Sequence, residues 1–304
     1  MEIPSTVSRT IDSGAKTQQS SSRLCPQTLS TMKGYDYRWF YGHPIPFVRY
    51  QDRVGEGAFP LFGYQNLRFL STKYCTNCQA ILTGPDDMCG DCRESPLFRR
   101  LRCILDGPGV PFGKQCTGDN PACDLQPWAD AICYTDWMLY VVSVFGLVKV
   151  GISRREKGNC SVGFTQRIIS QGAGEWIAFG PLRDMETAQR TEDELSNDLS
   201  LTQRVTSAEK WNYINYGKED VPLPREEVLR WTENQGIPLY MEGSFAEYFT
   251  SMPDNPYPVF GTVKDGVQGS LCWSRGSIAV FEHNGNRTAY DLAELAGLST
   301  VGGL

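Results

Sequence analysis

The stretch MLYVVSVFGLVKVGIS, residues 138–153, contains two short apolar runs that meet near Phe145 and Gly146. A transmembrane helix needs about 20 consecutive apolar residues, and these runs are too short and too broken for that. Two β-strands joined by a turn fit the pattern better. The sequence therefore predicts a hairpin with Tyr140 in its first strand and Lys149 in its second, either as ordinary core or as part of a site.

Composition predicts a folded protein outside the membrane. The chain has 304 residues, 40% hydrophobic and 12% aromatic, enough for a real core and two or three small units. Residues 1–32 are rich in Ser, Thr and Gln, which is typical of a flexible tail, and they lack the apolar region of a secretory signal. We therefore expect a cytoplasmic protein with no membrane partner, reduced thiols and no disulfide partner.

Cysteine spacing is the strongest motif in the chain. Two C-x2-C pairs, Cys75 with Cys78 and Cys89 with Cys92, are separated by ten residues. Each short turn aims two thiolates at one tetrahedral ion, so the spacing is close to that of a zinc ribbon. A pair of disulfides is the alternative. We expect a structural Zn²⁺ at these four residues.

A second group of cysteines follows without any C-x2-C pair. Its members are Cys103, Cys116, Cys123 and Cys133. They form either a second structural zinc site or a set of free buried thiols. The sequence thus predicts one or two zinc ions in total.

Histidine content and charge exclude several classes of protein. The two histidines, His43 and His283, lie in turn-like contexts away from any recognisable nucleophile motif, and no Walker loop or dinucleotide fingerprint is present. The formal net charge is −6, and residues 219–254 hold eight acidic and two basic side chains. Any nucleic-acid face must therefore be local. Basic residues between 134 and 180 fit phosphate contacts, or else an ordinary solvated surface.

Two helices are predicted after the hairpin. In the first, Phe164 and Ile168 form an apolar stripe, Arg167 and Gln171 a polar one, and Gly172 is a plausible end. In the second, from about 185 to 201, the apolar stripe is Ala188, Leu195 and Leu199, and Glu192 falls on the same face. A carboxylate there is costly unless it meets a cation or a metal. Pairing with an arginine, metal ligation and catalysis are all open.

These residues together resemble the GIY-YIG nuclease superfamily. The resemblance is carried by Tyr140, by Lys149-Val150-Gly151, by Arg167 and by Ala188-x3-Glu192, and it is closest to divergent members that read K-V/I-G in place of Y-I-G. The V-K-V-G and R-x3-Q-G-A motifs, the cysteines before them and the β-rich stretch after them are most similar to a prokaryotic group called domain of unknown function 2797. The similarity spans roughly residues 70–281.

The resemblance implies a chemistry for each residue. Glu192 would hold Mg²⁺ or Mn²⁺ beside the scissile phosphate, Tyr140 would bind or deprotonate the attacking water, and Arg167 would neutralise charge on the phosphoryl oxygens. Lys149 stands where the second tyrosine is usual and would bind phosphate as a point charge. The implied function is metal-dependent phosphodiester cleavage of DNA or RNA.

Two alternatives keep the same fold. Because a lysine cannot act as the same acid or base as a tyrosine, the protein is alternatively a zinc-containing nucleic-acid-binding protein without catalysis. The other alternative is group transfer on a small phosphorylated or aminoacylated substrate.

We expect an α+β fold: a zinc-ribbon module, a GIY-YIG-like α/β core and small β-rich flanking units. Asp265-Gly266 and Asn284-Gly285 predict turns between C-terminal strands, in which Trp273 and Phe281 either stack on bases or pack in the core. The predicted segments are a flexible tail (1–32), a β-rich N-terminal segment (33–70), a zinc-binding module (71–134), the core (135–205), a helical acidic segment (206–255) and a small β unit with a C-terminal tail (256–304).

Overall fold

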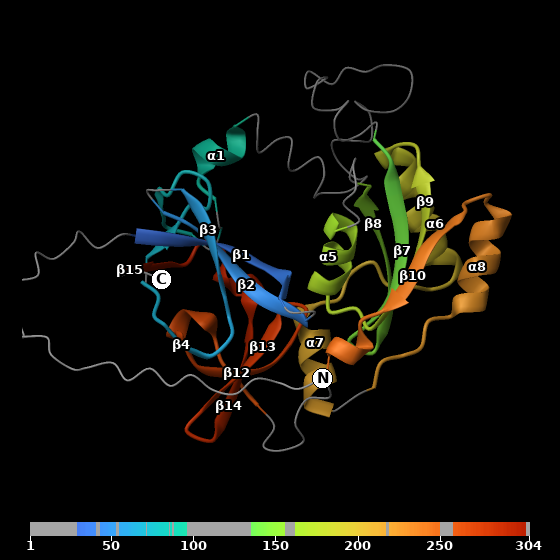
Figure 1. The fold of residues 1–304 in the computed structure, drawn as a ribbon. Helices are drawn as coiled ribbons and strands as arrows, with labels where there is room; N and C mark the ends of the chain where they lie inside the picture. The colour runs from blue at the N-terminus through green and yellow to red at the C-terminus, as the bar shows by residue number, and fades with distance from the viewer. Residues whose placement is uncertain are drawn as a thin grey trace, which may run out of the picture.

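The computed structural model describes residues 29–40, 43–52, 55–70, 72–84, 86, 88–95, 135–155, 162–216, 219–249 and 258–301. It is a mixed α+β structure in which the described strands form three larger sheets and one small two-stranded sheet (Figure 1). No helix in the described ranges is long and apolar enough to cross a membrane.

The predicted hairpin is present in the structure. Strands β7 (Trp137–Val144) and β8 (Leu147–Arg154) pair antiparallel through a turn at Phe145 and Gly146. Both turn residues have positive φ, 50° and 71°, which suits the twist of a two-residue hairpin. All eight residues of β7 are buried, so both faces of this strand are covered.

The hairpin belongs to a four-stranded core sheet with the order β10-β9-β7-β8. After β8 come α5 (Val162–Ser170), β9 (Glu175–Leu182) and α6 (Met185–Asp198), and β9 pairs antiparallel with β7. Both predicted helices are thus present, although α6 ends earlier than residue 201. Its first turn is capped by Asp184, whose carboxylate accepts from the Thr187 N–H at 2.7 Å.

The two faces of the core sheet are covered by different helices. Phe164 and Ile168 of α5 pack with Tyr140 and Val142 on one face. On the other face, α6 and α8 (Arg225–Asn234) cover the sheet, and the packed residues there are Leu139, Val141, Ala188, Leu195 and Val228. Figure 1 shows α5 between the core sheet and strands β1 and β2, with α6 and α8 on the far side.

The predicted helical acidic segment also contributes a strand. It contains α7 (Ser207–Tyr216) and α8, but β10 (Leu239–Ser244) pairs with β9 and extends the core sheet. The sequence of this segment does not predict the pairing, because an edge strand forms where the backbone N–H and C=O groups of a neighbouring strand are free to bond with it.

The N-terminal and C-terminal segments are interleaved. One sheet has the order β15-β1-β2-β3 and the other β11-β14-β13-β12-β4, so each joins strands from both ends of the chain. The strands are β1 (Leu29–Phe40), β2 (His43–Gln51), β3 (Glu56–Pro60), β4 (Tyr64–Leu67), β11 (Val259–Phe260), β12 (Val267–Arg275), β13 (Ile278–His283), β14 (Asn286–Asp291) and β15 (Ser299–Val301).

The described strands move one predicted boundary and decide one alternative that the sequence left open. Strand β1 begins at Leu29, inside the segment predicted as a tail, because residues 29–31 pair with the C-terminal strand β15. Trp273 and Phe281 are 7% and 0% exposed, so they pack in the core and do not present their rings for stacking on bases.

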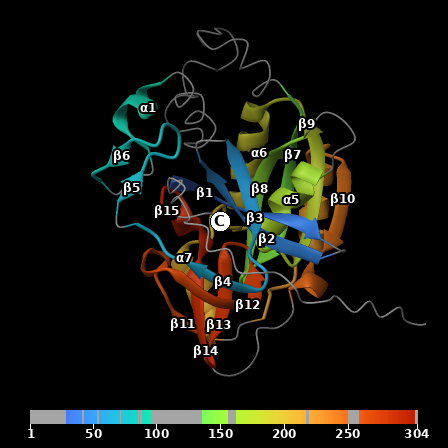
Figure 2. The ribbon, with the colours of Figure 1, turned by 60° about the vertical axis from the view of Figure 1, so that its left-hand side comes forward.

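A smaller unit projects from the β-rich side. It contains the two-stranded sheet β5 (Lys73–Tyr74) and β6 (Ile81–Leu82) and the short helix α1 (Gly90–Glu94). We call residues 72–95, as far as they are described, the cysteine module. Figures 1 and 2 both place it on the side of β1 that faces away from the core sheet.

Candidate functional site

Strand register explains why a tyrosine and a lysine lie in a buried hairpin. Tyr140 is paired with Gly151, and Lys149 with Val142, so both side chains point to the face that α5 covers. The Tyr140 ring lies over Gly151, where a Cβ atom would collide with the hydroxyl group. Tyr140 is 1% exposed. The glycine of the K-V-G motif therefore makes room for the tyrosine.

Gln171 connects the two strand residues. Lys149 Nζ donates to Gln171 Oε1 at 2.8 Å, and Gln171 Nε2 donates to the Tyr140 hydroxyl at 2.8 Å. Gln171 Nε2 also lies 3.3 Å from the Arg167 carbonyl oxygen. The helical pattern placed Gln171 beside Arg167, but its role between Lys149 and Tyr140 depends on α5 packing across the hairpin, which sequence spacing does not show.

Lys149 and Gln171 line a pocket of about 520 Å³ between the core, β1 and β2. Arg167 contributes to the same pocket, as do three charged residues that sequence reasoning did not select: Asp36, Arg49 and Lys210. Tyr140 and Glu192 do not line it. The structure therefore brings Lys149 and Arg167 to one pocket. Tyr140 lies outside it and is connected to Lys149 by hydrogen bonds through Gln171.

The pocket has four cationic residues and one acidic residue, in a chain with a net charge of −6. None of the four cations forms an ion pair within 4 Å with any residue the structure describes; those pairs involve other residues. Lys149 and Lys210 donate to the neutral acceptors Gln171 and Ser277, each at 2.8 Å. Arg49 and Arg167 are exposed. The pocket is thus a local excess of positive charge, three units by its lining residues.

Glu192 lies on the helix that covers the opposite face of the core sheet from the pocket. Its helix, α6, packs on the face away from α5, yet Lys149 is the cation that acts on its carboxyl group. Burial raises the pKa of Glu192 to about 7; Lys149 opposes this shift and Asp193 adds to it. Glu194 is exposed, whereas Glu192 and Asp193 are both half-buried. Glu192 does not, however, enter the pocket that Lys149 and Arg167 line.

A single carboxylate is a minimal ligand set for Mg²⁺ or Mn²⁺. Mg²⁺ is often held by one or two carboxylates together with phosphate oxygens of the substrate and water. Glu192 fits such a site only if the substrate supplies further oxygen ligands. Among the described residues, the group of three or more potential metal ligands that lie close together is the cysteine set and contains no carboxylate.

The four cysteines of the cysteine module do converge. The sulfur atoms of Cys75, Cys78, Cys89 and Cys92 all lie within 4.8 Å of one another. Tetrahedral ligation with Zn–S bonds of ≈ 2.3 Å requires sulfur separations of roughly 3.8 Å, and Cys78 Sγ and Cys89 Sγ are 3.5 Å apart. These four residues could hold one structural zinc ion.

Local structure aims the thiols inward. The Cys75 N–H donates to the Ala80 carbonyl oxygen at 2.7 Å, which closes the first knuckle, and α1 starts directly after Cys89. Burial of Cys75 opposes its ionisation, but hydrogen bonds from nearby backbone N–H groups, that of Cys78 foremost, outweigh burial and lower its pKa to about 6. Asn77 Nδ2 donates to Cys92 Sγ at 3.3 Å. Such donors favour thiolates, the form that binds metal, although burial and the neighbouring thiols Cys89 and Cys75 leave the pKa of Cys92 raised.

Four further cysteines make up the second predicted set of metal ligands. Cys103, Cys116, Cys123 and Cys133 lie outside the described residues. The second zinc site therefore stays a prediction.

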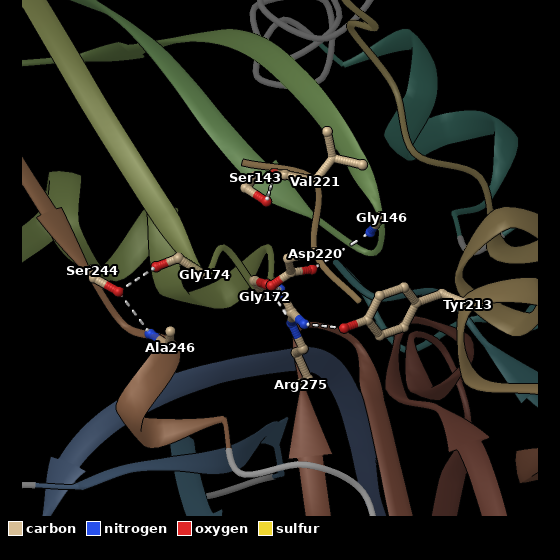
Figure 3. A network of polar contacts seen from close by, with 10 residues as sticks. All are labelled: Ser143, Gly146, Gly172, Gly174, Tyr213, Asp220, Val221, Ser244, Ala246 and Arg275. Atoms are coloured by element: carbon tan, nitrogen blue, oxygen red, sulfur yellow. Dashed lines mark hydrogen bonds and ion pairs between the residues drawn. The ribbon is translucent and has the colours of Figure 1, made fainter. Parts of the chain in front are cut away.

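Sequence reasoning missed a second polar network, which is centred on Arg275 (Figure 3). Arg275 of β12 is 4% exposed and donates to the Gly172 carbonyl at 2.7 Å, the Tyr213 hydroxyl at 2.8 Å and Asp220 Oδ2 at 2.6 Å. Its guanidinium also lies within 5.3 Å of three ring centroids, those of Phe145, Tyr213 and Phe249. We call these residues the Arg275 cluster. It ties the C-terminal sheet to the residue that follows Gln171.

No family model, no curated protein and no solved structure matches this chain.

Proposed function

We propose that this protein binds nucleic acid by its phosphate groups, with the pocket between α5, β2 and β8 as the contact site. One observation carries the proposal: Arg49, Lys149, Arg167 and Lys210 line one pocket and none has an anionic partner within 4 Å among the described residues. Positive charge gathered in a concave site attracts phosphate even when the whole molecule is acidic. Two exposed arginines suit this role, because guanidinium groups bind phosphate oxygens in pairs.

Metal-dependent cleavage of the bound strand is the second candidate. The succession of two strands, a helix, a third strand beside the first and a second helix supports the proposed GIY-YIG-like core. Glu192 favours cleavage, because a partly buried carboxyl group with a raised pKa is common at functional sites. The burial of Tyr140 and the position of Glu192 outside the pocket favour binding alone.

Binding is tested with labelled oligonucleotides and arginine variants. We expect Arg167→Ala and Arg49→Ala each to weaken binding on the order of tenfold at low salt and to reduce the salt dependence by roughly one phosphate contact. Arg230→Ala is the matched control, because Arg230 is an exposed arginine on α8, which covers the other face of the core sheet. Equal affinity of all three variants and the wild type would contradict the proposal.

Cleavage is tested separately, with Mg²⁺ and with Mn²⁺. If the site cuts, Glu192→Gln should abolish turnover while leaving affinity intact, because an amide lacks the anionic charge that a hard cation prefers. Binding without cleavage by the wild type would leave the non-catalytic function. Competition by a mononucleotide as effective as that by an oligonucleotide would favour the small-substrate alternative.

A further inference from the structure

We propose that a second basic pocket continues the first one and that the two together hold a single-stranded polynucleotide, which runs from the core to the cysteine module. This inference rests on the proposed phosphate-binding function. It adds the class of ligand and the path that the ligand takes over the surface.

The second pocket has a volume of about 540 Å³ and lies where β1, β2 and β3 meet the cysteine module. Its charged lining residues are Lys33, Arg38, Arg49 and Glu56, and the module contributes Thr76 and Asn77 to its wall. Lys33 Nζ donates to the Thr76 carbonyl oxygen, which fixes the module against β1. This hydrogen bond between two lining residues joins the second pocket to the cysteine module.

Arg49 lines both pockets, so they are neighbours on one surface. Strands β1 and β2 supply Asp36 and Arg49 to the first pocket and Lys33 and Arg38 to the second. Strand β1 lies between α5 and the cysteine module in both ribbon views (Figures 1 and 2). Across the two pockets six cationic residues face two carboxylates. The only ion pairs among these lining residues, Lys33 with Glu56 and Arg38 with Asp36, are as long as 3.9 and 3.6 Å.

This layout fits a strand better than a small phosphorylated molecule. One phosphate group can occupy one pocket, whereas six cations in two adjoining pockets match several phosphates at successive positions. Each pocket also has a tyrosine in its lining, Tyr35 in the first and Tyr50 in the second. Basic grooves with interspersed aromatic side chains are typical of sites for unpaired strands, whose bases are free to stack on them.

The two pockets can be tested independently, because Arg38 lines only the second and Arg167 only the first. The probes are fluorescein-labelled oligothymidylates of three and of about 15 nucleotides, a length in the range that one such groove covers, and a duplex of the longer length. We expect the longer strand to bind at least about tenfold more tightly than the trinucleotide and than the duplex. Arg38→Gln should weaken the longer strand roughly threefold to tenfold, lower its salt slope by about 0.7 and leave the trinucleotide unchanged.

Arg38→Lys and Arg230→Ala are the controls, and the first should retain most of the affinity because it keeps the charge. The Arg38 side chain is 50% exposed, so thermal unfolding of Arg38→Gln should match that of the wild type. Equal binding of short and long strands, no effect of Arg38→Gln, or a duplex bound as tightly as the single strand would overturn this inference. In those cases sensitivity to Arg167→Ala would still uphold the proposed function. Absence of binding to every probe would overturn both.

Discussion

Arg275 and the two pocket arginines, Arg49 and Arg167, lie near the adjacent residues Gln171 and Gly172 but differ in burial and in the partners of their guanidinium groups. Arg275 is buried, and its guanidinium group donates hydrogen bonds to a carbonyl, a hydroxyl and a carboxylate and lies close to three aromatic rings. Arg49 and Arg167, which line the same pocket as Gln171, are exposed, and their guanidinium groups form no hydrogen bond or ion pair with a described residue.

The difference indicates which cations hold the fold and which are available to a ligand. A buried charge must be satisfied by the protein itself, since leaving it unpaired costs several kcal/mol. A cation on a concave, solvent-reachable surface is hydrated in the free protein and can exchange that water for an anion. The Arg275 cluster is therefore complete without a ligand, whereas the exposed cations of the pocket are free to meet an anion and the four thiols could hold a metal ion.

Removal of zinc should have the largest effect. Zinc–thiolate binding contributes about 10–16 kcal/mol in small zinc-finger peptides, so Cys92→Ser should release the ion and unfold the cysteine module. Elemental analysis should give at least about one zinc per wild-type chain and about one fewer in the variant. Cys272→Ser is the control, because Cys272 is exposed and lies in β12, outside the set. Less than about one zinc per wild-type chain, after expression with ample zinc, would contradict the assignment.

Loss of the Arg275 guanidinium should come next. Arg275→Met leaves Asp220, Tyr213 and the Gly172 carbonyl without their donor, and we expect a loss of about 3–5 kcal/mol in the free energy of unfolding. The matched variant Arg167→Met should change stability by less than about 0.5 kcal/mol, because that arginine is exposed. Urea unfolding of both variants measures the contrast. Equal losses would remove the distinction between the two environments.

The pH dependence of stability should report on Glu192. Its pKa is raised from 4.5 to about 7 in the folded protein, so the folded state holds this proton more tightly than the unfolded state. Stability should therefore fall as the pH rises from about 5 to 7 and then level off, by up to roughly 3 kcal/mol. Lys149 and Asp193 are the charged groups that act on this carboxyl group. Glu192→Gln should flatten this part of the curve, and an unchanged slope would contradict the assignment.

The smallest expected effect concerns Gln171, which lines the pocket and is followed by Gly172 of the Arg275 cluster. Gln171→Leu removes the acceptor of Lys149 and the donor to Tyr140, and we expect a loss of about 1–3 kcal/mol, chiefly from the unsatisfied tyrosine. In a double-mutant cycle with Tyr140→Phe, the combined loss should be smaller than the sum of the two single losses. Strict additivity would show that the two side chains are not coupled.

Much of the core could be predicted from local pattern. Two apolar runs around Phe145 and Gly146 indicated the hairpin, and the stripes of Phe164 with Ile168 and of Ala188 with Leu195 indicated the two helices, because these signals repeat within one element. The spacing of Cys75, Cys78, Cys89 and Cys92 was equally local. Strand β10 and the start of β1 were not predicted, since each is defined by a partner strand distant in the chain.

Local pattern in the sequence is enough to predict what each element carries: Tyr140 and Lys149 in the two strands of a hairpin, Arg167 and Gln171 on one side of a helix, and four thiols at two knuckles. Which of these side chains meet depends on tertiary packing, which local pattern does not show. The pocket combines Arg49, Lys149, Arg167 and Lys210 from four separate elements, and Arg275 is paired through contacts more than fifty residues apart in the chain. Periodicity reports the neighbours within one element, whereas the charge that a site accumulates depends on how the elements pack.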